Sequence, residues 1–276
     1  MDLTKLDDLQ VALRLAGIKP KKGLGQHFLV DRPSLETIMG AADLKPSDVV
    51  LEIGPGLGVM TRPLCERARR VVAVEADPEL AELLGRDAPA NLAITHGDIL
   101  GFNLTTLPAD YKVVANLPYY LTANLLRRLL ESANPPVQMS LLLQKEVAER
   151  LTASPGELSV LALSVQYYAY AKMIAMVERH KFWPAPQVDS AVLQLIRRSQ
   201  PVFAAEPPRL FRLIKAGFGE RRKQLKNSLA GGLNASTETI IKLLNKAKIE
   251  PTKRAQELAL ADWQRLYDAA VGAQLI

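Results

Sequence analysis

The sequence predicts an α/β fold, in which helices cover a parallel sheet, followed by a smaller all-helical domain. Three observations indicate this arrangement. Short apolar runs alternate with amphipathic stretches over roughly the first 200 residues, which is typical of chains that alternate strands and helices. A glycine-rich turn separates the first buried run from the helix after it. Pro201, Pro207 and Pro208 then precede a basic, helix-like stretch.

We therefore predict one domain at 1–200, with an N-terminal arm at 1–30, and a second domain at 201–276. Hydrophobic residues make up 48% of the chain, and no apolar run approaches the ~20 residues of a membrane span. The N-terminus resembles neither a signal nor a transit peptide. Cys65 is the single cysteine, so we expect a reducing compartment, the cytoplasm. With only three histidines besides, we expect no metal site.

The N-terminal region is predicted to hold a helix and a basic loop. Residues 4–16 place apolar side chains at helical spacing, and Gly17 ends the helix. The loop at 19–29 contains three lysines, among them Lys21 and Lys22, and two glycines. It either packs on the domain as an arm or covers a bound ligand.

A glycine turn follows the first buried strand, predicted at 48–53 after a helix at 33–42. Strand, glycine turn and helix open the dinucleotide-binding fold. The turn Gly54-Pro55-Gly56-Leu57-Gly58, however, lacks the Gly-x-Gly-x-x-Gly spacing that seats a pyrophosphate. The tighter turn suits a ligand without a pyrophosphate, such as S-adenosylmethionine. A plain tight turn is the alternative.

Acidic residues follow the next two predicted strands. Glu75 ends the strand at 71–74, where such folds place an acid that accepts from ribose hydroxyls. Asp98 follows the strand at 92–95 and is placed to hold the adenine amine of a cofactor. Either carboxylate alone fits a helix cap. Ligands of open α/β sheets bind at the carboxyl ends of strands, so the combination predicts a binding site.

The strand at 113–115 ends in Asn116-Leu117-Pro118-Tyr119. The proline keeps Leu117 extended and offers a carbonyl without a competing N–H group. Asn116 adds a side-chain oxygen, and Tyr119 adds a flat aromatic face. Acceptors beside an aromatic plane suit the exocyclic amine of adenine, whose lone pair they would direct outward. A turn that closes a core strand is the alternative.

The rest of the first domain contributes one more aromatic candidate. The loop at 182–191 begins with Phe182 and contains two prolines. It either stacks Phe182 on an extruded base, opposite Tyr119, or packs the ring beneath the loop. The remaining elements are predicted strands at 138–143, 172–177 and 191–197, and helices at 121–133, 144–152 and 161–168.

The C-terminal stretch carries most of the positive charge. Residues 209–254 hold twelve Lys and Arg against three Glu, a surplus larger than the net charge of +6 of the whole chain. This asymmetry favours a polyanionic partner over a solvated helical face. Charge is densest at 220–227, where phosphate contacts would set affinity and register. Helices are predicted at 209–217, 223–230, 237–245 and 252–270.

Seven motifs occur in the order known from one family: Gly25-Gln26-His27-Phe28-Leu29, the stretch from Glu52 to Gly58, Glu75, Gly97-Asp98, the stretch from Asn116 to Tyr119, the 182–191 loop and Arg221-Arg222-Lys223. Over roughly residues 20–230 the chain resembles the ribosomal RNA adenine dimethyltransferases of the KsgA type. The resemblance implies a class I S-adenosylmethionine-dependent methyltransferase sheet of seven strands, the last antiparallel. It also implies that 1–200 is catalytic and that 201–276 binds rRNA.

The resemblance further implies four methyl transfers from S-adenosylmethionine to N6 of two adjacent adenosines. These lie in the 3′-terminal hairpin loop of 16S rRNA and are modified late in the assembly of the small ribosomal subunit. The expected partner is therefore 16S rRNA in an immature small subunit, bound by a monomer away from any membrane.

Cofactor contacts are carried over from the family position by position, while the catalytic group and the RNA contacts are expected from the residues themselves. The expected cofactor contacts are His27, Leu29, Gly54, Gly56, Glu75, Asp98 and Asn116. The expected catalytic group, which holds the adenine for in-line transfer, is Asn116, Pro118, Tyr119 and Phe182. The expected RNA contacts are Lys21, Lys22, Arg221, Arg222 and Lys223.

Two other functions fit many of the same motifs. One is the antibiotic-resistance type of enzyme, which dimethylates an adenine of large-subunit rRNA; the basic C-terminal stretch and the Phe182 loop favour the small-subunit type. The other is a non-catalytic assembly factor on the same fold, which the intact Asn116–Tyr119 motif and Glu75 argue against. The glycine spacing makes a dehydrogenase the weakest alternative.

Overall fold

The computed structural model describes residues 1–118, 121–220 and 222–276. The chain forms two compact units. The first unit comprises Met1–Glu149 and Ala171–Arg197, and the second comprises Arg150–Tyr170 and Arg198–Ile276. No helix in these described parts of the chain is long and apolar enough to cross a membrane.

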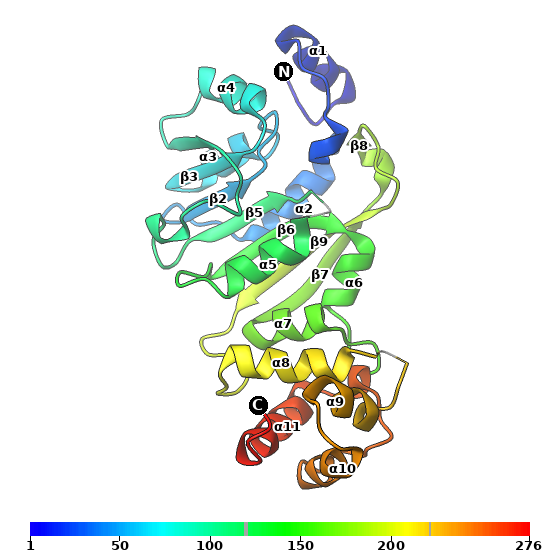
Figure 1. Ribbon diagram of the computed structural model, residues 1–276. Helices are drawn as coiled ribbons and strands as arrows, with labels where there is room; N and C mark the ends of the chain where they lie inside the picture. Colours follow the sequence, from blue (N-terminus) through cyan, green and yellow to red (C-terminus); the bar gives the residue numbers. More distant parts are fainter. Residues whose placement is uncertain (119–120, 221) are drawn as a thin grey trace. The chain divides into compact units, whose positions relative to one another are not determined.

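A seven-stranded sheet forms the centre of the first unit, in the order β4-β3-β2-β5-β6-β9-β7 (Figure 1). Neighbouring strands from β4 to β6 are parallel, whereas β9 runs antiparallel to β6. The predicted α/β fold class is thereby confirmed. The strands are β2 (Val49–Ile53), β3 (Arg70–Glu75), β4 (Leu92–His96), β5 (Lys112–Asn116), β6 (Gln138–Gln144), β7 (Ala169–Val177) and β9 (Ser190–Arg197).

The strand order reverses between β2 and β5. The chain proceeds from β2 through β3 to β4 on one side, and from β5 to β6 on the other. Crossover connections diverge at such a point and leave a crevice at the carboxyl ends of the strands. All five residues of β2 are buried, as are all but the first of β3, so apolar runs specify these central strands.

Helices pack on this sheet. Helix α2 contacts β5, β6 and β9, while α3 and α4 contact β3. Asp31 caps α2 by accepting from the Ser34 N–H at 2.9 Å, which sets where the helix begins. The helices in this part of the chain are α1 (Leu6–Ala16), α2 (Arg32–Ala42), α3 (Thr61–Arg67), α4 (Pro78–Arg86), α5 (Thr122–Leu130) and α6 (Lys145–Leu151).

The predicted N-terminal arm forms a short strand. Strand β1 (Phe28–Leu29) pairs antiparallel with β8 (Phe182–Trp183), so that Leu29 lies opposite Phe182. Phe28 also joins a cluster with Leu9 and Leu13 of α1. The arm is therefore anchored on both sides of the basic loop.

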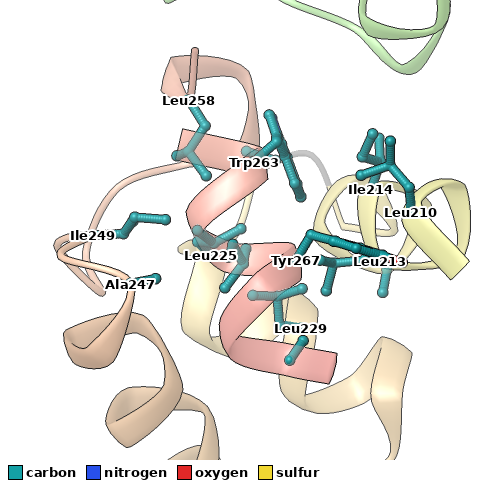
Figure 2. Packing of buried hydrophobic residues seen from close by; sticks show 14 of the residues in the cluster. Leu210, Leu213, Ile214, Leu225, Leu229, Ala247, Ile249, Leu258, Trp263 and Tyr267 are labelled. Carbon is teal, nitrogen blue, oxygen red and sulfur yellow. The ribbon is translucent and has the colours of Figure 1, made fainter. Parts of the chain in front are cut away.

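The second unit is helical and has its own hydrophobic cluster (Figure 2). Trp263 is fully buried there, and a Cβ on Gly217 would lie only 2.7 Å from its ring, so a glycine permits this close packing. The helices are α7 (Val160–Tyr168), α8 (Pro207–Phe218), α9 (Leu225–Leu233), α10 (Thr237–Lys246) and α11 (Leu260–Gly272).

The segment 150–170 belongs to this second unit, whereas the sequence placed it in the first domain. Its apolar side chains explain the difference. Leu163 and Tyr167 are part of the second unit's cluster, and the Tyr167 hydroxyl donates to the Phe203 carbonyl at 2.9 Å. The later division, after Arg197, lies close to the boundary predicted at 200.

Candidate functional site

A cavity of about 550 Å³ lies in the first unit, at the carboxyl ends of β2, β3 and β5. This is the place that the strand order predicts for a ligand, and the volume is that of a small-molecule site. Eight of the predicted site residues line it: His27, Leu29, Gly54, Gly56, Glu75, Asp98, Asn116 and Pro118.

The glycine turn forms one wall of this cavity. Gly54, Gly56 and Gly58 have φ values of 66°, 59° and 86°, which residues with a side chain rarely adopt. A Cβ on Gly56 would lie 3.0 Å from the Phe28 ring. The backbone conformation therefore favours glycine here, a Cβ would also press on the Phe28 ring, and the turn offers bare backbone to the cavity.

Glu75 is held rigidly beside that turn. Its Oε2 accepts from the Gly56 N–H and its Oε1 from the Asp77 N–H, each at 2.9 Å. Burial raises the pKa of Glu75, against the lowering effect of these two hydrogen bonds. A carboxylate has about four acceptor positions. Glu75 can therefore accept from hydroxyl groups of a ligand while it keeps both backbone contacts.

Asn116 ends β5, and the arm orients its amide. Its Nδ2 donates to the His27 carbonyl at 2.9 Å. This bond assigns the amide nitrogen to the arm and leaves Oδ1 as an acceptor at the cavity. None of the residues that the structure describes donates to this oxygen. Asn116 thus presents a fixed acceptor without an internal partner in the described chain.

Pro118 follows Asn116 along the cavity wall. Its carbonyl accepts from the Leu121 N–H at 3.0 Å, and a carbonyl oxygen has a second lone pair for a ligand. Tyr119, predicted to supply the aromatic face, lies outside the described residues. Asp98 is exposed at the cavity and accepts from the Leu100 N–H at 2.9 Å.

His27 joins the arm to the segment after β8. Its Nδ1 lies 2.6 Å from the Pro184 carbonyl, so the ring nitrogen donates there. The same residue's carbonyl holds Asn116. A residue predicted to touch the cofactor therefore also positions the acceptor on β5.

Comparison with known proteins identifies the family. The model of ribosomal RNA adenine dimethylases matches residues 17–270. The chain belongs to this family. Ribosomal RNA small subunit methyltransferase A of Dehalococcoides mccartyi is 43% identical over 259 residues, which cover 90% of this chain and 88% of that protein. The enzyme of the same name from Pelotomaculum thermopropionicum is 41% identical over 281 residues, which cover 95% of each chain.

Solved structures agree with the family and with its class I methyltransferase fold. A dimethyladenosine transferase from Plasmodium falciparum aligns with a TM-score of 0.79 and 25% identity, covering 90% of this chain and 98% of that one. The 23S rRNA methyltransferase ErmE aligns with a TM-score of 0.71 and 27% identity, covering 88% and 98%.

Phe182 is not brought to the cavity in this member of the dimethylase family. Its side chain is 3% exposed and packs in a hydrophobic cluster with Leu29 and Ile38. The sequence interpretation that stacks this ring on a base is therefore corrected. Pairing of β8 with β1 buries the ring, which matches the alternative of aromatic packing beneath the loop.

The predicted RNA contacts have different surroundings. Lys21 is paired with Asp77 at 2.8 Å and also with Glu79, so in this structure it holds the arm and is not a free cation. Lys22 is exposed. In the second unit Arg222 and Lys223 are exposed, and Lys223 pairs with Glu220. Arg221 lies outside the described residues.

Sequence reasoning missed two residues near the site, Gln26 and Asp77. Asp77 is recognisable in the sequence as a helix cap, because Pro78 begins α4 directly after it. Its contacts with the arm bridge more than fifty positions, as the separation of 56 between Lys21 and Asp77 shows. No local sequence pattern signals a contact of that kind.

Proposed function

We propose that this protein transfers methyl groups from S-adenosylmethionine to N6 of adenosines in ribosomal RNA. In full, we propose dimethylation of two adjacent adenosines in the 3′-terminal hairpin loop of 16S rRNA. The substrate is an immature small ribosomal subunit late in its assembly, and the protein acts as a monomer in the cytoplasm.

The observation that carries the proposal is the orientation of Asn116. The amide nitrogen of Asn116 donates a hydrogen bond to the arm, so Oδ1 remains at the cavity as an acceptor. An adenine amine offers two donors and a lone pair delocalised into the ring. Acceptance of one of its hydrogens by Oδ1, and of the other by the Pro118 carbonyl, directs the lone pair away from the ring plane.

The cavity residues fit S-adenosylmethionine. The bare backbone of the turn around Gly56 admits a ligand at close range, and a Cβ there would meet the Phe28 ring. Glu75 and Asp98 both line the cavity, and we propose that Glu75 accepts from ribose hydroxyls and Asp98 from the adenine amine of the cofactor. When bound, the cofactor supplies a methyl group activated by a sulfonium.

The chain's own residues then act by orientation. Asn116 and Pro118 hold the amine of the target base, while the arm around His27 lines the same cavity and orients Asn116. Aligning two reactants in this way can contribute about 7–11 kcal/mol to a reaction barrier in principle. We also propose that Tyr119 supplies an aromatic face for the extruded base.

We propose that the second unit binds the rRNA backbone. Arg222 and Lys223 are exposed on a segment between α8 and α9, and Arg221 is adjacent in the sequence. Lys22 of the arm adds a further exposed cation. Phosphate contacts from such residues set affinity and register, while base choice falls to the cavity.

A second candidate is dimethylation of a large-subunit adenine, which the structural likeness to ErmE favours. The relatives named for the small subunit are more similar in sequence, at 41–43% identity against 27%. Mapping the modified nucleotides by mass spectrometry, after incubation of immature small subunits and of large-subunit rRNA with labelled cofactor, separates the two.

The test of the proposal is Asn116→Ala. Loss of the oriented acceptor should lower the methylation rate by about 10²-fold or more, the usual effect of removing one preorganised hydrogen-bonding group. The melting temperature should change little. Asn245→Ala, which changes an exposed amide on α10, is the matched control and should methylate at the normal rate. A normal rate for Asn116→Ala would refute the role of Oδ1.

A further inference from the structure

Asp77 lies at a junction of three segments. It caps α4 by accepting from the Glu79 N–H at 3.1 Å. Its two carboxylate oxygens also accept from the Lys21 Nζ and from the Gln26 Nε2, each at 2.8 Å. Its side chain has no exposed surface, although it bears a charge. Three donors satisfy a buried carboxylate that would otherwise be costly.

The two arm residues are joined to each other as well. The Gln26 Oε1 accepts from the Lys21 backbone N–H at 2.8 Å, so the loop between them is closed on itself. Leu24, Gly25 and Gln26 all line the cavity. We call Lys21, Gln26 and Asp77 the arm clasp, because these three side chains hold the cavity-lining part of the arm against the first turn of α4.

The arm clasp also connects to the acid of the site. The Asp77 N–H donates to the Glu75 Oε1, and the Glu75 Oε2 accepts from the glycine turn. The position of Asp77 therefore affects both the arm and the carboxylate proposed to bind the cofactor's ribose. Burial acts to raise the pKa of Asp77, but hydrogen bonds from Lys21 and Gln26 outweigh it and keep the pKa low.

We propose that Asp77 is a positioning residue, which holds the arm closed over the cavity through Lys21 and Gln26 and thereby slows the exchange of cofactor and product. The proposal rests on the cofactor assigned under the proposed function. The arm is anchored elsewhere by β1 and by the Phe28 cluster. Release of the arm clasp should thus loosen only the segment between Ile18, which belongs to the same cluster as Phe28, and β1.

Two variants open the arm clasp without removing the cap of α4. Lys21→Met deletes the ion pair and keeps the length of the side chain. Gln26→Glu keeps the acceptor for the Lys21 N–H but turns a carboxylate oxygen toward Asp77, so that like charges repel. Glu82→Gln is the matched control, since Glu82 lies on the same helix and pairs with Arg86.

The first measurement is trypsin cleavage after Lys22, which reports opening of the arm in the ligand-free protein. Cleavage should be about fivefold faster in Lys21→Met, as expected of one partly exposed ion pair, and faster still in Gln26→Glu. Added salt should speed cleavage of the unaltered protein but not of Lys21→Met. Equal cleavage rates in both variants, the control and the unaltered protein would overturn the proposal.

The second measurement is the dissociation rate of labelled S-adenosylhomocysteine. It should rise in the same order as cleavage, with melting temperatures close to that of the control variant. If dissociation is unchanged while cleavage accelerates, the arm clasp does not control exchange and the proposal fails. Failure of the unaltered protein to bind the labelled compound would instead refute the proposed cofactor, while the cleavage comparison would still test the arm clasp.

Discussion

Glu52 lies on β2, two residues before Gly54 of the glycine turn. It should make the stability of the first unit depend on pH. The side chain is fully buried, and neither carboxylate oxygen has a hydrogen-bond partner among the described residues. Burial, assisted by the nearby charge of Glu75 and opposed by the neighbouring Thr61 hydroxyl, which lies outside good hydrogen-bond geometry, raises the pKa of Glu52 from 4.5 to about 8. The carboxyl is therefore neutral in the folded protein at neutral pH.

The sign and size of the effect follow from proton linkage. Between pH 4.5 and about 8 the folded state keeps a proton on Glu52 that the unfolded state has lost. The free energy of unfolding should therefore fall as pH rises through this window, by at most about 1.4 kcal/mol for each pH step. Above the window both states are ionised and the loss levels off.

The perturbation that tests this is Glu52→Gln, which keeps the shape and removes the titration. Urea unfolding at several pH values from 5 to 8.5 measures the free energy of unfolding of both proteins. As pH rises, this free energy should increase in the variant relative to the unaltered protein, by about a few kcal/mol in total. A difference in the free energy of unfolding that is the same at every pH reflects the amide itself and does not bear on the titration of Glu52. Glu82→Gln, at an exposed position, should give a curve parallel to that of the unaltered protein. Parallel curves for Glu52→Gln would refute the reasoning.

Two further predictions concern the second unit. Replacing Arg222 and Lys223 together with Gln should weaken rRNA binding and reduce the slope of log affinity against log salt by about 1.4–1.8, if each contacts one phosphate; filter binding over a salt series measures this. Gly232→Ala should destabilise by about 1–3 kcal/mol, because its Cβ would lie 2.6 Å from the Ala216 Cα. Gly231→Ala, whose Cβ would meet no atom within 4 Å, should be neutral or slightly stabilising in the same thermal melts.

The cavity could be predicted from the sequence because its residues follow from local signals and one rule of topology. The apolar run of β2 and its glycine turn are visible in the sequence, as are the acid that ends β3 and the amide that ends β5. Parallel neighbours end at the same edge of a sheet, so Glu75 and Asn116 must lie near the turn. The structure places both at the cavity.

The fate of the aromatic loop could not be predicted in this way. Whether Phe182 stacks on a base or packs in the core depends on its partner strand, Phe28–Leu29, which lies far away in the sequence. Two residues paired with two others leave no periodic pattern that identifies them as strands. The membership of segment 150–170 in the second unit could not be predicted for a similar reason. The sequence of an apolar helix does not indicate which of two hydrophobic cores it packs into.

Residues of the N-terminal arm line the cavity and also contact the residues that form it. The His27 carbonyl orients Asn116, and the Phe28 ring lies so close to Gly56 that a Cβ there would be 3.0 Å from it. One segment therefore shapes both the proposed cofactor cradle and the acceptor for the target amine. A change that displaces this segment should weaken cofactor binding and slow methyl transfer together, whereas a cover without structural contacts would affect only exchange. Because β1 anchors these contacts and the arm clasp holds the loop before them, partial opening can release a product without dismantling the acceptor.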